Sequence, residues 1–500
     1  MDDDDNGVMA EFQGVSTAQV EWRTEHDLLG MRDLPADSYF GIHTLRALEN
    51  FSITGTPVAH YPLFIVALAT VKQAAARTNC TLGLLEQKKA DAIEMACEEI
   101  RQGALHNEFV VDMIQGGAGT STNMNANEVI ANRGLEIMGL VKGEYAHLHP
   151  LNDVNMGQST NDAYPTALTV ATHAAIGDLR DAMQLLQETF SAKATEFKDV
   201  LKMGRTQLQD AVPMSLGQEF TTFAIMLDED VERLTEARAL MREVNLGGTA
   251  IGTGINTDER YSVLAISELA RITGVEFTPA FNLIEATQDV GSFVQVSSVL
   301  KRIAIKLSKT SNDLRLLSSG PRAGFGEINL PPRQAGSSIM PGKVNPVIPE
   351  VVNQIAFEVI GNDVTITMAA EAGQLQLNAF EPIIAFSLFK SITHLSAGCR
   401  TLAKFCVAGI TANHEFLYET VARSIGPVTA LSPIIGYDEA TSVARDALES
   451  NRSVIAVVLE RELMTKDEVD RVLDLEYLTS PGIHRQLQHF QRCTDGNLET

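Results

Sequence analysis

Residues 336–346 read Gly-Ser-Ser-Ile-Met-Pro-Gly-Lys-Val-Asn-Pro. The two glycines permit backbone angles that other residues avoid, while Pro341 and Pro346 restrict the segment, so it can hinge without becoming a random coil. Its polar groups suit an anion, because Lys343 supplies a positive charge and Asn345 supplies two donors. The alternative interpretation is an inert, turn-rich loop between two helices.

Three other polar blocks precede this one. Residues 116–121 read Gly-Gly-Ala-Gly-Thr-Ser, residues 158–162 read Gln-Ser-Thr-Asn-Asp, and residues 204–210 read Gly-Arg-Thr-Gln-Leu-Gln-Asp. Together with residues 336–346 they resemble the conserved blocks of the aspartase/fumarase superfamily, in the family's order. Members cleave a C–N or C–O bond by anti elimination and release fumarate. The similarity runs from about residue 27 to about residue 475 and is strongest to members that act on L-aspartate.

The resemblance implies a mainly α, three-domain fold around a long central five-helix bundle. Residues 1–20 are an acidic tail that we expect not to fold. We then expect an N-terminal helical domain over 21–158, the helix bundle over 159–408, and a small helical domain over 409–500. Within the last of these, the sequence predicts three short helices, at 438–449, 454–463 and 466–473, with Thr465 as an N-cap.

Hydrophobic periodicity independently predicts the bundle. From residue 162 onward, apolar residues step by three, four and seven positions, as they do at Ile176, Leu179, Met183, Leu186 and Phe190. The runs at 349–371 and 386–406 are apolar on more of their surface. This breadth indicates burial against other subunits, and it predicts a homotetramer whose active sites are shared between subunits.

Composition limits the class of protein. The chain has 500 residues, of which 45% are hydrophobic, enough for about three domains. No apolar run reaches the ~18 residues that a membrane span needs, and no secretory signal opens the chain, so we expect a cytoplasmic protein without a membrane partner. The net charge of −25 argues against nucleic acid as a partner. Five scattered cysteines indicate neither a disulfide framework nor a zinc site.

Elimination next to a carboxylate creates a second negative charge on that group, an aci-carboxylate, which is costly unless donors already point at it. By resemblance, four hydroxyls are those donors: Thr120, Ser159, Thr160 and Ser338. The same resemblance gives Lys343, Asn345 and Thr206 the other carboxylate, and it gives Asn161 and Gln207 the amino group. A simpler explanation for Ser159 or Thr160 alone is helix capping.

The resemblance makes Ser337 the general base. An isolated alcohol is a poor base at neutral pH, so Ser337 must lose its proton in a site that favours the alkoxide, through backbone N–H groups or nearby positive charge. Closure of the loop over bound substrate would assemble the base and exclude water.

Three hypotheses follow. The first is the reversible conversion of L-aspartate to fumarate and ammonia. The second is a class II fumarase-like hydratase, which is disfavoured by Gln207, where fumarases carry His, and by Leu45 and Leu151. The third is a non-catalytic structural protein that reuses the fold, against which the complete set of polar residues argues.

Two accessory features remain open. Arg46 is either a cation that supports the site or the partner of Glu49 in a surface ion pair. No cofactor is expected to be required. A divalent metal such as Mg²⁺ is allowed by the resemblance as an activator, but the sequence shows no ligand set, and the spacing of His147 and His149 is too weak a pattern to predict one.

Overall fold

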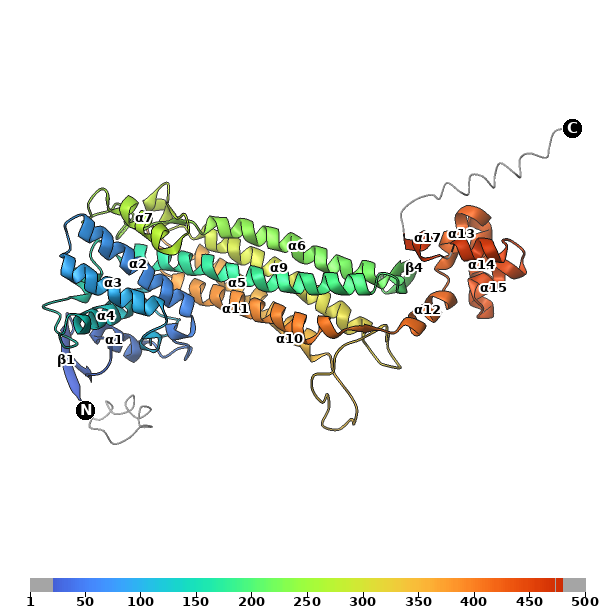
Figure 1. The fold of residues 1–500 in the computed structure, drawn as a ribbon, viewed down its shortest axis with the longest axis horizontal. Helices are drawn as coiled ribbons and strands as arrows, with labels where there is room; N and C mark the ends of the chain where they lie inside the picture. Colours follow the sequence, from blue (N-terminus) through green and yellow to red (C-terminus); the bar gives the residue numbers. More distant parts are fainter. Residues whose placement is uncertain (1–20, 473, 480–500) are drawn as a thin grey trace. The chain divides into compact units, whose positions relative to one another are not determined.

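The computed structural model describes residues 21–472 and 474–479. The predicted acidic tail, residues 1–20, lies outside the described residues. Helices dominate the fold, as predicted (Figure 1). They are α1 (Ile42–Asn50), α2 (Pro62–Thr81), α3 (Gln87–Arg101), α4 (Thr120–Ile137), α5 (Thr160–Glu196), α6 (Leu216–Leu240), α7 (Tyr261–Thr273), α8 (Leu283–Ala286), α9 (Gly291–Leu317), α10 (Val347–Glu371), α11 (Glu381–Phe405), α12 (His414–Arg423), α13 (Pro427–Ile435), α14 (Tyr437–Ser450), α15 (Val454–Glu460), α16 (Lys466–Val472) and α17 (Leu475–Thr479).

Strands are short and form four two-stranded sheets in the described part of the chain. Three of the pairs are antiparallel and the pair β5–β6 is parallel. The strands are β1 (Trp22–Asp27) with β2 (Gly30–Pro35), β3 (Leu201–Thr206) with β4 (Gln209–Ser215), β5 (Glu243–Val244) with β6 (Thr278–Pro279), and β7 (Ile328–Asn329) with β8 (Thr411–Ala412).

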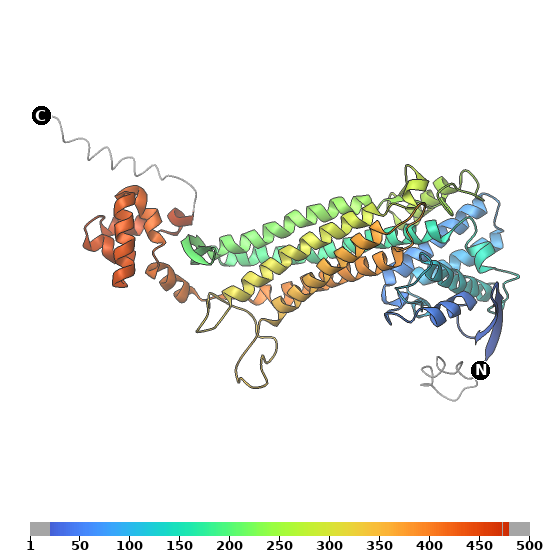
Figure 2. The same ribbon diagram turned by 180° about the vertical axis from the view of Figure 1, so that it is seen from behind.

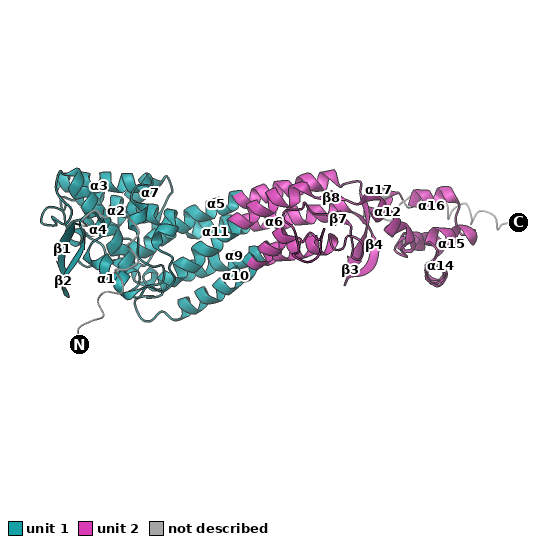
Figure 3. Cartoon of the chain, turned by 90° about the horizontal axis from the view of Figure 1, so that it is seen from below, with its two compact units in different colours: residues 1–181, 232–304, 355–396 teal, residues 182–231, 305–354, 397–500 magenta. Residues whose placement is uncertain are grey.

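The chain divides into two compact units (Figure 3). Unit 1 comprises residues 1–181, 232–304 and 355–396, and unit 2 comprises residues 182–231, 305–354 and 397–500. The five predicted long helices are present as α5, α6, α9, α10 and α11, and each contributes residues to both units. The boundaries of the three predicted domains stay a prediction.

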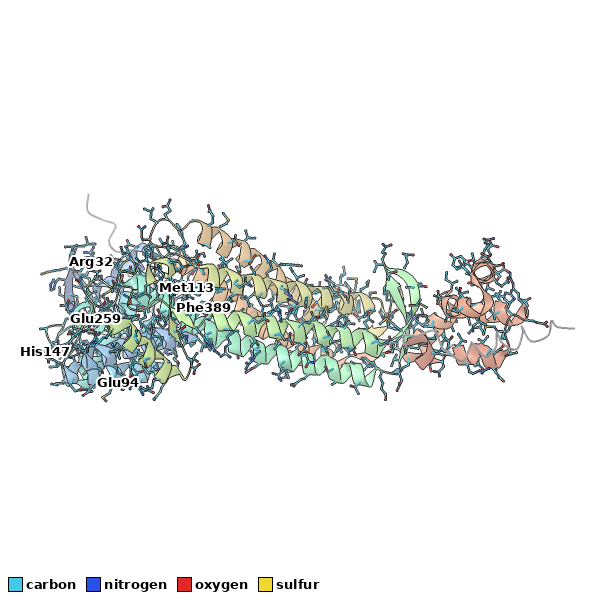
Figure 4. All side chains as sticks on the ribbon, turned by 90° about the horizontal axis from the view of Figure 1, so that it is seen from above. Arg32, Glu94, Met113, His147, Glu259 and Phe389 are labelled. Carbon is cyan, nitrogen blue, oxygen red and sulfur yellow. The ribbon has the colours of Figure 1, made fainter. Side chains whose placement is uncertain are left out.

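Unit 1 is organised around α2, which contacts α3, α4 and α7. Helix α2 is buried on almost every side. Its first ten residues are apolar apart from Thr70, and the polar residues Lys72, Gln73, Thr78 and Asn79 that follow are buried as well. Phe64 of α2 packs its ring against Tyr164 and Phe389, with centroids 5.3 Å and 5.2 Å away. Met113 and Phe389, labelled in Figure 4, are buried, whereas Arg32 is exposed.

The portions of the long helices in unit 1 are joined by buried and partly buried polar contacts. The Ser297 hydroxyl of α9 donates to the Asp363 carboxylate of α10 at 2.8 Å, and Lys301 donates to the same carboxylate at 2.5 Å. The Asn362 amide of α10 donates to the Ser391 hydroxyl of α11 at 3.0 Å. These contacts fix which faces of the helices meet, a choice that apolar packing alone leaves less specific.

Unit 2 contains an aromatic cluster and a separate small core. Phe190 of α5 lies against Phe220 and Phe223 of α6, with ring centroids 6.0 Å and 5.5 Å away. The C-terminal helices, which Figure 2 shows from the opposite side to Figure 1, surround nine buried apolar residues. These are Leu431, Val443, Ala447, Val454, Val457, Val458, Met464, Val469 and Val472.

The three short C-terminal helices that the sequence predicts are α14, α15 and α16. The N-cap prediction at Thr465 is also confirmed. Its backbone N–H donates to the Glu468 carboxylate at 2.8 Å, and the Glu468 N–H donates to the Thr465 hydroxyl at 3.4 Å. This reciprocal pair is a capping box, which satisfies two backbone donors at the start of a helix.

Candidate active site

Two of the polar blocks meet in unit 1. Thr160 begins α5, and its hydroxyl accepts a hydrogen bond from the Asn123 amide of α4 at 3.2 Å. Gly119 precedes α4 with φ +91°, and a Cβ atom there would lie 2.3 Å from the Tyr164 ring. Only glycine therefore allows the block around Thr120 to approach the block at 159–161.

The hydroxyls of these two blocks make local contacts. Thr120 is exposed, and its hydroxyl donates to the Gly117 carbonyl at 2.7 Å. The Ser159 oxygen accepts from the Asn161 backbone N–H at 3.2 Å. Ser159 therefore keeps its proton for donation to a ligand, whereas Thr120 must release the Gly117 carbonyl before it can donate elsewhere. Helix capping therefore explains the hydrogen bond that the Ser159 oxygen accepts, but it leaves the Ser159 hydroxyl proton without an assigned acceptor.

A buried lysine supports this region. Lys72 of α2 is fully buried, and its ammonium donates to the side-chain oxygens of Asn123 at 2.6 Å, Asn155 at 2.9 Å and Gln158 at 2.8 Å. Burial lowers the pKa of Lys72 to about 7, although the charge of Asp162 opposes this shift. Lys72 thereby ties α2 to α4 and to the residues just before Ser159.

In unit 2, Thr206 and Gln207 lie at the tip of the β3–β4 hairpin. Thr206 ends β3 and pairs with Gln209, while Gln207 and Leu208 form a two-residue turn with φ of +55° and +61°. Positive φ at both positions is typical of a type I′ turn, which usually contains glycine or asparagine. Both Thr206 and Gln207 are exposed at this tip.

Buried charges fix the base of this hairpin. Glu327 is 1% exposed and pairs with two cations of β3, Lys202 at 3.0 Å and Arg205. The Arg205 guanidinium also lies 4.5 Å from the centroid of the Phe325 ring. Since Glu327 is ten residues before Ser337 in the sequence, one carboxylate connects the Thr206 hairpin to the segment that leads into the 336–346 loop.

The 336–346 loop is closed on itself. The Gly336 backbone N–H donates to the Lys343 carbonyl at 2.8 Å, and the Asn345 amide donates to the Gly336 carbonyl at 2.7 Å. The Ser337 oxygen accepts from the backbone N–H groups of Ile339 at 3.2 Å and Met340 at 2.9 Å. Ser338 and the Lys343 side chain are exposed.

The ten predicted residues thus form three groups. Thr120, Ser159, Thr160 and Asn161 belong to unit 1, whereas the hairpin tip and the loop belong to unit 2. Within the described part of unit 2, no hydrogen bond joins the hairpin tip to the 336–346 loop. Each group presents hydroxyls, amides or an ammonium and no carboxylate of its own, which suits a dianionic ligand.

Comparison with known proteins assigns the family. A lyase family model matches residues 30–361, which is more than half of the chain, and a fumarase C C-terminus model matches residues 428–480. The chain belongs to the aspartase/fumarase superfamily. Aspartate ammonia-lyase of Pseudomonas fluorescens is 59% identical over 470 residues, 94% of this chain and 98% of that protein. The Escherichia coli K12 aspartate ammonia-lyase is 54% identical over 461 residues, 92% and 96% of the two chains.

Solved structures of the superfamily share the fold. A fumarate lyase:delta crystallin from Brucella melitensis bound to cobalt has a TM-score of 0.90 and 53% identity, covering 92% of this chain and 100% of that one. A class II fumarase from Schistosoma mansoni has a TM-score of 0.86 and 34% identity, covering 91% and 99%. Their similarity agrees with the mainly helical fold predicted from the polar blocks.

Two buried charged residues, Lys72 and Asp162, adjoin the candidate site and are not among the residues predicted from the sequence. Lys72 directly follows the mostly apolar residues 62–71 of α2, and a lysine at that position is a signal in the sequence, since a buried cation needs partners. Asp162, in the first turn of α5, is fully buried and accepts three backbone N–H bonds. Two of its donors come from residues 247–249, a segment whose proximity to Asp162 the sequence alone does not reveal.

Arg46 pairs with a carboxylate other than Glu49, and its role as a cation that supports the site stays a prediction. Its guanidinium pairs with Asp27 at 2.7 Å and 2.8 Å, and Glu49 instead pairs with Arg32 at 3.4 Å. Arg46 also donates to the Gly30 carbonyl, so it holds the β1–β2 hairpin against α1. The surface-pair alternative with Glu49 is therefore wrong, because the hairpin brings a better-placed carboxylate to Arg46.

No group of three or more His, Cys, Asp or Glu side chains in the described part of the chain is arranged to hold a metal ion. His149 instead accepts hydrogen bonds from the backbone N–H groups of Leu151 and Asn152 at 3.0 Å and 3.2 Å. Among the described helices, none combines the length and apolar character required to cross a membrane.

Proposed function

We propose that this chain is an aspartate ammonia-lyase, a carbon–nitrogen lyase that reversibly eliminates ammonia from L-aspartate to give fumarate. The observation that carries the proposal is identity of 54–59% to proteins of that name over at least 92% of the chain. The loop geometry supports the proposal, because the Ser337 oxygen already accepts hydrogen bonds that would stabilise its alkoxide.

Ser337 is the general base in this proposal. Its oxygen already accepts two backbone hydrogen bonds, from Ile339 and Met340. Backbone N–H groups aimed at an oxygen favour its charged form and need no rearrangement as charge develops. The Lys343 ammonium, carried on the same loop, adds positive potential. The alkoxide removes the proton next to the substrate carboxylate that becomes the aci-carboxylate.

The remaining residues bind the two carboxylates and the amino group. Thr120, Ser159, Thr160 and Ser338 donate to the aci-carboxylate, and their neutral hydroxyls stabilise the extra charge as it forms. Lys343, Asn345 and Thr206 hold the other carboxylate. Asn161 and Gln207 face the amino group, which leaves when the electron pair of the broken C–H bond forms the double bond and the C–N bond breaks.

We propose a homotetramer in which different subunits complete each site. Helix α10 supports an interface, because Phe357, Val364 and Met368 are 64%, 56% and 67% exposed on one of its faces. Their spacing of seven and four residues forms an apolar stripe that a monomer would leave in water. Four described cysteines are free, which fits the cytoplasmic location that we propose.

A subunit-mixing experiment tests the shared site. Asn161→Ala and Ser337→Ala are each expected to be inactive alone. After mild dissociation and reassembly of an equal mixture, sites that take these residues from different subunits should recover about a quarter of wild-type activity. Light scattering reports the assembly. Mixed tetramers that stay inactive would show that each site takes both residues from one subunit.

The activity itself is tested by following fumarate absorbance with L-aspartate and, separately, with L-malate. We expect fumarate to form from L-aspartate and not from L-malate. Turnover of L-malate alone would identify a hydratase, and no turnover of either would favour a non-catalytic protein. The same assay with and without Mg²⁺ tests whether a divalent cation activates the enzyme. No step of the proposed mechanism uses such a cation.

A further inference from the structure

The carboxamide of Asn161 has a fixed orientation. Its Nδ2 donates to the Ala250 backbone carbonyl at 2.7 Å. A carbonyl oxygen can only accept, so turning the amide over would bring two acceptors together at hydrogen-bond distance. The Asn161 amide oxygen therefore faces away from Ala250 and is the atom offered to a ligand.

The loop that carries Ala250 is held by Asp162. One oxygen of this carboxylate accepts from the backbone N–H groups of Gly247 at 3.0 Å and Thr249 at 2.9 Å. Its other oxygen accepts from the Ser159 N–H at 2.9 Å. Asp162 is fully buried, so water does not compete for these bonds. A single side chain thus sets the loop and the start of α5 relative to each other.

The backbone of residues 247–252 leaves this loop little freedom. Gly247 has φ +93°, and a Cβ atom there would lie 2.6 Å from the Ser262 Cβ. Thr249 adopts φ +54°, which is unfavourable for a β-branched residue and persists only where surrounding contacts require it. The Asn245 side-chain amide also donates to the Asn161 backbone carbonyl at 3.0 Å. The Ala250 carbonyl is therefore a rigid acceptor.

An amide with a fixed orientation discriminates between leaving groups. A substrate ammonium has donors only, so it needs an acceptor and is repelled by an amide N–H. A substrate hydroxyl can donate or accept, so it gains less from a fixed acceptor. Burial raises the pKa of Asp162 to about 6, although the three backbone N–H groups oppose the shift, and the group is thus mainly a carboxylate at neutral pH.

We propose that Asp162 is a positioning residue for substrate specificity: through the Ala250 carbonyl it directs the Asn161 amide oxygen toward the amino group, favouring an amine over a hydroxyl. This inference rests on the proposed function. It assigns a role to two groups, a buried carboxyl and a backbone carbonyl, that do not themselves touch the substrate.

The test is Asp162→Asn, measured in the direction of fumarate amination. The KM for ammonia should rise about ten-fold or more, the change expected when a hydrogen bond to a charged group is misplaced. The inhibition constant of succinate, which has both carboxylates and no amino group, should change by less than about two-fold. A purely structural role would move both constants together or neither.

Glu128→Gln is the matched control. Glu128 is also a buried carboxyl of unit 1 and also accepts three backbone N–H bonds, from Gly41, His43 and Thr44. The same chemical change there should lower stability while leaving both constants near wild type. Gly247→Ala is the second test variant, because its Cβ displaces the loop and leaves Asp162 in place. It should raise the KM for ammonia without changing the succinate inhibition constant, and it replaces Asp162→Asn as the test if that variant does not fold.

Equal shifts of the ammonia KM and the succinate constant in Asp162→Asn, or no shift in either, would overturn the inference. A wild-type protein that does not aminate fumarate would overturn the proposed function and the inference together. A wild-type protein that does aminate fumarate, combined with equal shifts in the variants, would overturn the inference alone.

Discussion

The backbone N–H of Met340 donates to the Ser337 oxygen at 2.9 Å, and this bond ties a candidate base to the chain three residues further on. Because the donor belongs to the same loop, a movement of the whole loop would keep this hydrogen bond. In the loop closure that we propose, the oxygen would carry its stabilising donors to the substrate.

Replacing Ser337 by alanine should abolish turnover without harming the fold. The residue lies in an exposed polar loop, so the lost oxygen leaves no buried partner unsatisfied. Loss of a positioned general base should lower kcat by at least ~10²–10⁴-fold while the KM for L-aspartate changes little. Steady-state kinetics and a melting curve check both points.

Ser338→Ala is the control for that variant, since it removes a proposed donor to the aci-carboxylate, for which a loss of about 10²–10³-fold is expected. If Ser337→Ala keeps more than roughly a tenth of wild-type kcat, the base must be another residue.

Replacing Lys343 by methionine should chiefly weaken binding. The change keeps the length and flexibility of the side chain and removes the charge offered to the substrate carboxylate. The KM for L-aspartate should rise roughly ten- to hundred-fold, as expected for a lost hydrogen bond to a charged group. Lys198→Met is the matched control, because Lys198 is a 70% exposed lysine of the same unit. Equal KM values in the two variants would exclude contact between Lys343 and the substrate.

Gly336→Ala should open the loop. An added Cβ would lie 2.6 Å from the Lys343 carbonyl oxygen and 2.8 Å from the Asn345 nitrogen, so the hydrogen bonds that close the loop cannot persist. Misplacing the base and the carboxylate ligands by about 1 Å is expected to cost about 10²-fold in kcat/KM. The melting temperature should stay near wild type, because the loop is largely exposed.

The control for the loop is Gly177→Ala in α5, where the nearest neighbour of a new Cβ is the flexible end of Arg238 at 3.3 Å. Helix propensity favours alanine at such a position. Wild-type kinetics in both glycine variants would mean that the hydrogen bonds between the two ends of the 336–346 loop are not needed for catalysis.

Glu128 should make stability depend on pH. Burial raises its pKa from the ordinary 4.5 to about 7, so between these values the folded protein holds a proton that the unfolded chain has released. Stability should therefore fall as the pH rises through this window, by an amount on the order of 3 kcal/mol, and then level off above about pH 7.

Glu128→Gln cannot titrate, so its denaturation midpoint should vary less between pH 4.5 and 7 than that of wild type. The comparison uses the slopes of the two curves, since the variant is also less stable overall after losing an acceptor for a backbone N–H. Parallel curves would show that Glu128 stays ionised throughout this range.

The sequence alone determined the family and the helical architecture. Residues 336–346 and the three earlier blocks combine residue types and order too specific to arise from capping or turns alone, and the family match confirms that reading. The five long helices follow from periodicity, because burying one face of a helix requires apolar residues at that spacing. The capping box at Thr465 was predictable since all its groups lie within four residues.

Contacts between residues far apart in the chain were decided only by the tertiary structure. The β3–β4 turn has Gln207 and Leu208 at positive φ and lacks glycine, so the local signal for a hairpin is missing. Arg46 met Asp27 rather than Glu49, and Asp162 met Gly247 and Thr249 some 85 residues away. Local propensity cannot specify such partners, because a buried carboxylate is satisfied by any correctly placed donors and packing alone selects which donors arrive.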